Sequence, residues 1–203
     1  MDGGETWSPY TLNEYVYLNN GDSVAFSGTG DHFSKDASNY YRVIVKNSVT
    51  NGLNVYGNIM SLVNGASALV DDYQFANLFN ADTGHTGNRK GNIRYITGLI
   101  LPENTTPYCY LEFLYGNSGF TDAFELPATT LTSGCYKGMF YGCMYLSSVS
   151  VSFTDWGDTE NTSGWVDGVF TNGEFICPTA LGTNASITRG ISNCPSHWTV
   201  TNT

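Results

Sequence analysis

The sequence predicts a mainly β fold with short helical turns, in which an N-terminal β cap is followed by a short solenoid and a C-terminal cap. Three observations predict this fold. Charged residues make up only 13% of the 203 residues, apolar and polar residues alternate near the N-terminus, and the central part of the chain repeats itself. Because helices with solvated faces use Lys and Glu freely, a polar surface of uncharged side chains favours strands and turns.

Residues 1–70 are expected to form the N-terminal β cap. Thr11–Leu18 alternates in polarity, Ser23–Ser27 alternates again, and Tyr40–Val49 is the most β-prone stretch of the chain. A further strand-like stretch follows the Asn51-Gly52 turn signal, which makes about four strands in all. A passive cap is the simpler role for this unit, and a binding site of its own is the alternative.

Residues 71–152 contain a repeat with a period near 26 residues, since Cys135-Tyr136 follows Cys109-Tyr110 at that spacing. A fainter copy precedes both, with Leu78-Phe79 in the place of Met139-Phe140. One such unit cannot bury its apolar face alone, so the repeat predicts a solenoid of about two to three stacked turns. The expected core residues are Leu101, Cys109, Phe113, Leu114, Phe120, Leu126, Cys135, Met139, Phe140, Cys143, Leu146, Val149 and Val151.

The repeat is interrupted by an insertion at residues 80–91. Phe79 and Leu114 are 35 residues apart, whereas Leu114 and Phe140 are 26 apart, and the extra residues lie in this polar, glycine-rich stretch. Insertions in solenoids form loops on one face, which is often the binding face. Tolerated extra length is the simpler explanation. The candidate binding residues of the insertion are His85, Arg89 and Lys90.

Residues 153–203 are expected to form the C-terminal cap. They contain three of the four tryptophans, which suit the covering of an open last turn, and we find no further copy of the repeat after Val151. Asp155, Asp158 and Glu160 suggest a calcium loop at first sight, but the spacing of an EF-hand is absent, so ordinary turn acids are expected.

Tyrosines recur at fixed positions of the repeat, and they are the main candidates for recognition. They fall between the apolar positions, so we expect them to face partly outward in two short rows. Tyrosine offers a large contact area with a polar tip and little entropy to lose, which suits binding of protein or glycan. The alternative is that the rings stack on one another and shield a weakly charged surface. The candidates are Tyr108, Tyr110, Tyr115, Tyr136, Tyr141 and Tyr145.

The cysteines are expected to be structural. Five is an odd number, no Cys-x-x-Cys pair occurs, and none of the three histidines stands at a metal-binding spacing from a cysteine, so no metal site is predicted. Cys109 and Cys135 hold the same position in successive copies and should stack as free, buried thiols. Cys177 and Cys194 each precede a proline, and a disulfide between them is the alternative to free thiols there.

No catalytic residues and no cofactor are predicted. The sequence contains no Gly-x-Ser-x-Gly, no His-Glu-x-x-His, no phosphate-binding loop and no Gly-x-Gly-x-x-Gly. A pair of acids across a cleft, as in glycosidases, stays open because sequence alone does not place carboxylates in space. Enzymatic activity is therefore not expected.

The charge balance excludes two classes of partner. A net charge of −10 with only eight Lys and Arg leaves no basic stripe for nucleic acid or anionic membranes. No apolar run approaches the roughly 18 residues of a membrane-spanning helix, so direct membrane insertion is not expected. The first residues lack the features of a signal peptide.

The repeat resembles that of the BspA-like leucine-rich repeat proteins of gut Bacteroidetes, which runs Ile-Gly-x-x-Ala-Phe-x-x-Cys-x-x-Leu-x-x-Ile-x-Ile-Pro. The opening SPYTLNEYVYLNNGDSVAFSG and the closing segments are similar as well, so the resemblance covers nearly the whole chain. Asn117 departs from it, because it stands where the next copy has Cys143. The repeat positions are held in order by Cys135, Met139, Phe140, Cys143, Leu146, Val149 and Val151.

This resemblance implies a non-catalytic, adhesin-like binding module with leucine-rich-type turns, at the cell surface or outside the cell. Its ligand would be a protein or glycan on a host or bacterial surface. The alternative is a structural protein of a Bacteroidetes phage or prophage, such as a tail-fibre tip or capsid decoration on the virion surface. The missing signal-peptide features favour this alternative. A phage fibre would be expected to form a trimer; otherwise the oligomeric state stays open.

Overall fold

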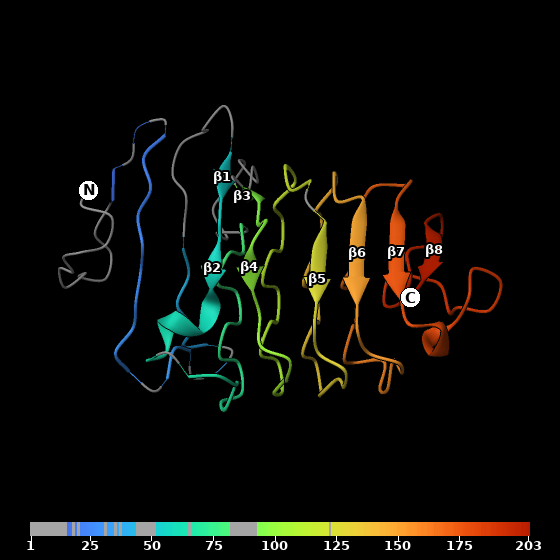
Figure 1. The fold of residues 1–203 in the computed structure, drawn as a ribbon, viewed down its shortest axis with the longest axis horizontal. Coiled ribbons are helices and arrows are strands. Elements are labelled where there is room, and N and C mark those ends of the chain that lie inside the picture. The colour runs from blue at the N-terminus through green and yellow to red at the C-terminus, as the bar shows by residue number, and fades with distance from the viewer. Residues whose placement is uncertain are drawn as a thin grey trace.

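The chain forms a β-solenoid, mainly β with almost no helix among the described residues (Figure 1). Strands and turns of successive rungs lie side by side along one axis. The structure is a computed structural model, and it describes residues 16–17, 19, 21–30, 32–34, 36, 38–43, 52–64, 66–81, 93–121 and 123–203.

A four-stranded parallel sheet forms one side of the solenoid (Figure 1). Its neighbours are 25 or 26 residues apart, since Phe124 pairs with Val149, Val149 with Phe175, and Phe175 with Val200. Each strand is therefore contributed by one turn of the solenoid. The strands, in sheet order, are β5 (Phe124–Leu126), β6 (Ser148–Val151), β7 (Glu174–Cys177) and β8 (Thr199–Asn202).

Two short parallel pairs continue the stack toward the N-terminus: β1 (Leu53–Asn54) with β3 (Ile93–Tyr95), and β2 (Gly57–Asn58) with β4 (Leu99–Ile100). The 3₁₀ helix η1 (Ile59–Leu62) follows β2 directly. Strand pairing thus crosses the expected boundary at residue 70, and residues expected in a cap belong to the stack.

The expected strand at Ser23–Ser27 is absent, because this segment has no regular secondary structure. It is anchored next to the following rung by the backbone N–H of Gly28, which donates to the carbonyl of Ser61 at 2.9 Å. Most of the other two expected strands, Thr11–Leu18 and Tyr40–Val49, lies outside the described residues.

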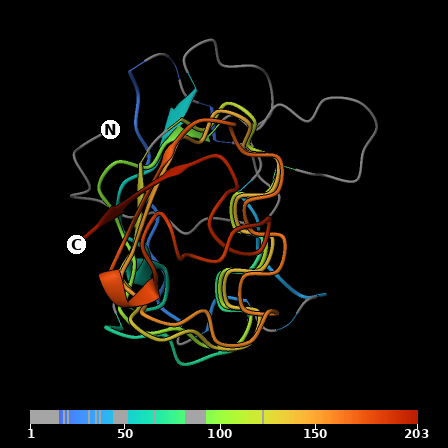
Figure 2. The ribbon, with the colours of Figure 1, turned by 90° about the vertical axis from the view of Figure 1, so that its right-hand side faces the viewer.

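Opposite the sheet, each rung runs through consecutive β-turns, which we call the turn ribbon. Two kinds of hydrogen bond alternate along it: the N–H of Lys137 donates to the carbonyl of Gly134 within a turn (3.1 Å), and the N–H of Gly138 donates to Ser163 of the next rung (2.9 Å). Every fourth residue has a positive φ, as at Gly134, Gly138 and Gly142. Figure 2, along the stack, shows successive ribbons superimposed. The turn ribbon comprises residues 73–81, 108–117, 134–143 and 160–169.

Along residues 108–117, the turn ribbon buries its residues in consecutive pairs. Cys109-Tyr110 is buried, Leu111-Glu112 is half-buried, Phe113-Leu114 is buried, and Tyr115-Gly116 is half-buried again. All thirteen residues expected in the core are buried between this ribbon and the strands. An aromatic stack runs through this interior, with the ring centroids of Tyr110 and Tyr136 5.9 Å apart.

The expectation that no further copy follows Val151 is wrong. The N–H of Tyr136 donates to the carbonyl of Asn161 at 2.9 Å, so a further turn ribbon stacks on the third one, and its strand is β7. The glycine spacing of Gly138 and Gly142 recurs 26 residues later at Gly164 and Gly168. After the 3₁₀ helix η2 (Thr179–Leu181), the chain ends on β8.

Candidate functional site

The first stacked tyrosine pair on the outer side of the turn ribbon is Tyr115 with Tyr141. Their ring centroids are 4.6 Å apart and the rings are tilted by only 6°. Each precedes a glycine of the ribbon, and a β-carbon built at Gly142 would lie 3.7 Å from the Cα of Gly116, so the two backbones approach closely. This spacing holds the rings in register. Tyr141 is 36% exposed, and Tyr145, a few residues later, is 58% exposed.

The second pair is Tyr73 with Tyr108, whose centroids are 4.8 Å apart at an angle of 6°. Both residues take the positive-φ position of the turn, with φ of 57° and 56°. The other side of Tyr108 faces Gly134, where an added β-carbon would lie 2.2 Å from Cε1 of the ring. Sequence reasoning missed Tyr73, although its distance of 35 residues from Tyr108 equals the longer spacing already found in the repeat.

Charged side chains lie beside the second pair. Nζ of Lys137 is 2.6 Å from Oε1 of Glu160, and this hydrogen bond raises the pKa of Lys137. Partial burial, together with the neighbouring Tyr108, raises the pKa of Tyr73 above its usual range. Like any tyrosine, Tyr73 is protonated at neutral pH, so its hydroxyl both donates and accepts hydrogen bonds.

The expected outward position of Tyr110 and Tyr136 is wrong, because both are buried at 1% exposure. The reason is the pairwise burial of the ribbon, which places the residue after Cys109 or Cys135 inside along with the cysteine. Burial raises the pKa of both tyrosines well above the usual value. They belong to the core, and the hydroxyl of Tyr110 has no hydrogen-bond partner among the described residues.

The candidate residues of the insertion, His85, Arg89 and Lys90, lie outside the described residues. The structure does describe what holds the two flanks of the insertion. Nδ2 of Asn117 donates to the carbonyl of Phe79 at 2.6 Å, and its Oδ1 accepts the N–H of Ile93 at 3.3 Å. The side-chain amide of Asn117 thus bonds to both flanks at once, as donor and as acceptor, which a thiol at this position could not do. This explains why asparagine replaces the cysteine of the repeat.

The remaining side chains with reactive chemistry are dispersed. Within the ranges that the structure describes, no group of three or more His, Cys, Asp or Glu is placed to hold a metal ion. The five cysteines are buried free thiols, including Cys177 and Cys194. Burial raises the pKa of Cys194 to about 11, although the nearby Arg189 acts in the opposite direction.

Comparison with known proteins adds no relative: no family model, no curated protein and no solved structure matches this chain. One structural finding bears on membranes. The described part of the chain contains no helix with the length and apolarity needed to cross a bilayer.

Proposed function

We propose that this chain is a non-catalytic binding module that recognises protein or glycan through the outer side of its turn ribbon. The observation that carries the proposal is the pair of tyrosine stacks, Tyr115 with Tyr141 and Tyr73 with Tyr108, held at 4.6 and 4.8 Å by the stacking of rungs. Tyr145, four residues after Tyr141, is exposed as well.

The physics of recognition favours such a surface. A stacked tyrosine has few free rotamers to lose when it meets a ligand, and each ring combines apolar contact area with a hydroxyl. The repeat sets the separation of the rings, so the site is pre-organised before binding and little ordering cost remains. The charged side chains beside the second pair, Lys137 and Glu160, pair with each other, so the surface suits a neutral ligand, such as an uncharged glycan or a polar protein loop.

The finer assignments rest on the resemblance of the repeat. We propose leucine-rich-type turns of the BspA class, and a place at the cell surface or outside the cell. A structural role on a phage virion is the alternative, and genomic neighbours that encode capsid or tail proteins would favour it over an adhesin.

The experiment compares wild-type protein with Tyr115→Ala plus Tyr141→Ala on glycan, mucin and protein arrays. We expect the double variant to lose at least tenfold in affinity for any ligand that the wild type binds. Tyr56→Ala is the matched control, because Tyr56 is an exposed tyrosine outside the turn ribbon and next to β2. Unchanged binding by the double variant, with an unchanged melting temperature, would contradict the proposal.

A further inference from the structure

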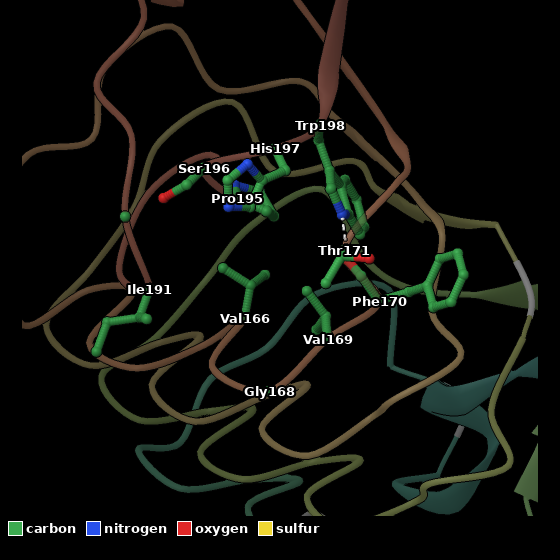
Figure 3. A pocket seen from close by; sticks show the side chains of 11 residues that line it. Val166, Gly168, Val169, Phe170, Thr171, Ile191, Pro195, Ser196, His197 and Trp198 are labelled. Carbon is green, nitrogen blue, oxygen red and sulfur yellow. Dashed lines mark hydrogen bonds between the residues drawn. The ribbon is translucent and has the colours of Figure 1, made fainter.

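A hollow of about 180 Å³ lies at the C-terminal end of the solenoid (Figure 3). Val166 and Trp198 line it as buried residues, and Phe170 and Ile191 stand at it with exposed side chains. The indole N–H of Trp198 donates to the carbonyl of Phe170 at 2.7 Å, which fixes one wall.

The hollow lies where one more turn ribbon would stack. In the preceding rungs, the N–H of Gly116 donates to the carbonyl of Tyr141 at 2.7 Å, and the N–H of Gly142 donates to that of Asp167 at 2.8 Å. Gly168 holds the same position in the last ribbon and lines the hollow, but its N–H has no hydrogen-bond partner among the described residues. Gly168 is exposed, so this N–H meets solvent, and an incoming carbonyl oxygen would take the place of water there.

Neighbouring donors of the last ribbon are already covered by the returning chain. The N–H of Val166 donates to the carbonyl of Ile191 at 3.2 Å, and the N–H of Gly164 donates to Oγ of Ser192 at 2.9 Å. The returning segment therefore accepts hydrogen bonds from Gly164 and Val166 but not from Gly168. A ligand at this point extends an existing ladder of hydrogen bonds by one step.

Charge selects among carbonyl-bearing ligands. The lining contains no Asp, Glu, Lys or Arg, and His197 is its one titratable side chain. Arg189 is the cation next to this lining, but its guanidinium already donates to the carbonyls of Pro195, Ser196 and Trp198. A carboxylate would compete for a group in use, in a chain of net charge −10, and would carry a desolvation cost. A neutral amide carbonyl matches the single N–H, and the apolar walls match an aliphatic side chain next to it.

We infer that the hollow binds a peptide segment of a partner protein. A main-chain carbonyl of the segment accepts the N–H of Gly168, and an aliphatic side chain fills the space between Val166, Val169 and Trp198. The volume suffices, since an apolar cavity of about 150 Å³ holds benzene. Main-chain hydrogen bonding provides affinity, and the side-chain space provides selectivity, as in other peptides that add to a β structure.

The test titrates acetyl-Gly-Leu-Gly-amide into ¹⁵N-labelled protein and follows the amide signal of Gly168 and the indole signal of Trp198. We expect saturating shifts of both signals, with at least tenfold tighter binding than for acetyl-Gly-Gly-Gly-amide. The change Ile191→Asp, at a 55% exposed position of the rim, should weaken the leucine peptide at least fivefold by placing an anion beside the incoming carbonyl.

Three results would overturn the inference: no shift with 20 mM of the leucine peptide, equal affinity for both peptides, or unchanged affinity in Ile191→Asp. If Ile191→Asp does not give a dispersed spectrum, Ile191→Lys replaces it. A cation beside the incoming carbonyl should tighten binding of the leucine peptide at least twofold, and unchanged or weaker binding in this variant would overturn the inference. The double variant Tyr115→Ala plus Tyr141→Ala should bind the leucine peptide as the wild type does, which separates this site from the tyrosine stacks.

Discussion

The ring of Tyr108 packs directly against Gly134. A β-carbon added to Gly134 would lie only 2.2 Å from Cε1 of Tyr108. Gly134 also has a φ of 62°, which L side chains rarely adopt. Backbone conformation and ring packing therefore both require glycine at this position.

Gly134→Ala should lower the free energy of unfolding by about 3 kcal/mol or more, through a left-handed backbone and an overpacked ring. Gly164→Ala is the matched control, since Gly164 has a φ of 63° but no heavy atom within 4 Å of an added β-carbon. Its cost should be about 1–2 kcal/mol. Urea unfolding measures both, and equal losses would show that the ring of Tyr108 moves away freely.

Tyr110→Phe should leave the free energy of unfolding unchanged or raise it by about 1 kcal/mol. The hydroxyl of Tyr110 is buried without a hydrogen-bond partner among the described residues, so its removal ends a desolvation cost and breaks no bond. Tyr110→Leu, which also removes the ring from the aromatic stack with Phe75 and Tyr136, should be clearly destabilising. A loss above about 1 kcal/mol in Tyr110→Phe would contradict this account.

Stability should fall as the pH rises above about 9. Burial raises the pKa of Cys109, Cys143 and Tyr110, so the folded chain keeps protons that the unfolded chain releases near the usual pKa of thiols and phenols. The unfolded state then binds fewer protons, and each such group lowers the free energy of unfolding by about 1.4 kcal/mol per pH unit.

Urea unfolding at pH 8 and pH 10.5 tests this, with full stabilisation expected below about pH 8. The slope should be shallower in Tyr110→Phe, which lacks one of the titrating groups. A free energy of unfolding that is constant or rising over this range would contradict the buried, protonated state. Thiol labelling gives a second check, because Cys109 and Cys135 should react quickly only after denaturation.

Arg189→Lys should lower the stability of the C-terminal end by about 2 kcal/mol. Nη1 of Arg189 donates to the carbonyl of Trp198 at 2.9 Å, and Nη2 donates to Oδ1 of Asn184 at 2.7 Å. An ammonium cannot span this fork. Oδ1 of Asn184 also accepts the N–H of Val200 in β8 at 3.3 Å, so the loop covers part of the edge of the sheet.

Loss of this cover should also promote association, because an uncovered edge strand pairs with other chains. Asn184→Ala should therefore form oligomers as its concentration rises, which analytical ultracentrifugation detects. Arg42→Lys is the control, because Arg42 lies far from the C-terminal loop in the chain, beside the ring of Tyr40. A strictly monomeric Asn184→Ala at every concentration would contradict the role of edge cover.

The repeat allowed the core to be predicted but misplaced two tyrosines. Spacing alone identifies Cys135, Met139 and Leu146 as equivalent positions, and burial follows from their recurrence. Whether the side chain of Tyr136 points inward depends on the local backbone. Side chains alternate between the two faces of a strand, whereas consecutive β-turns bury neighbouring residues in pairs. Glycines at every fourth residue, from Gly134 onward, were the signal for such turns.

The ends of the solenoid were less predictable for a physical reason. Strands of two residues, such as β1 and β2, form because a neighbouring rung is already in place, and they leave little pattern of their own. The stack of Tyr73 on Tyr108 likewise joins residues of two rungs that the insertion separates in the sequence. At the C-terminal end, the recurrence of Gly164 and Gly168 was visible, but the replacement of aromatic residues around them hid it.

The amide of Asn117 holds the chain at Phe79, before the insertion, and at Ile93, directly after it. Both anchor points are main-chain groups, so they place no demand on the side chains between them. A single side chain thereby uncouples the register of the stack from the content of the loop. A change of length or sequence between Ala81 and Ile93 should therefore keep the rungs aligned as long as Asn117 makes both hydrogen bonds.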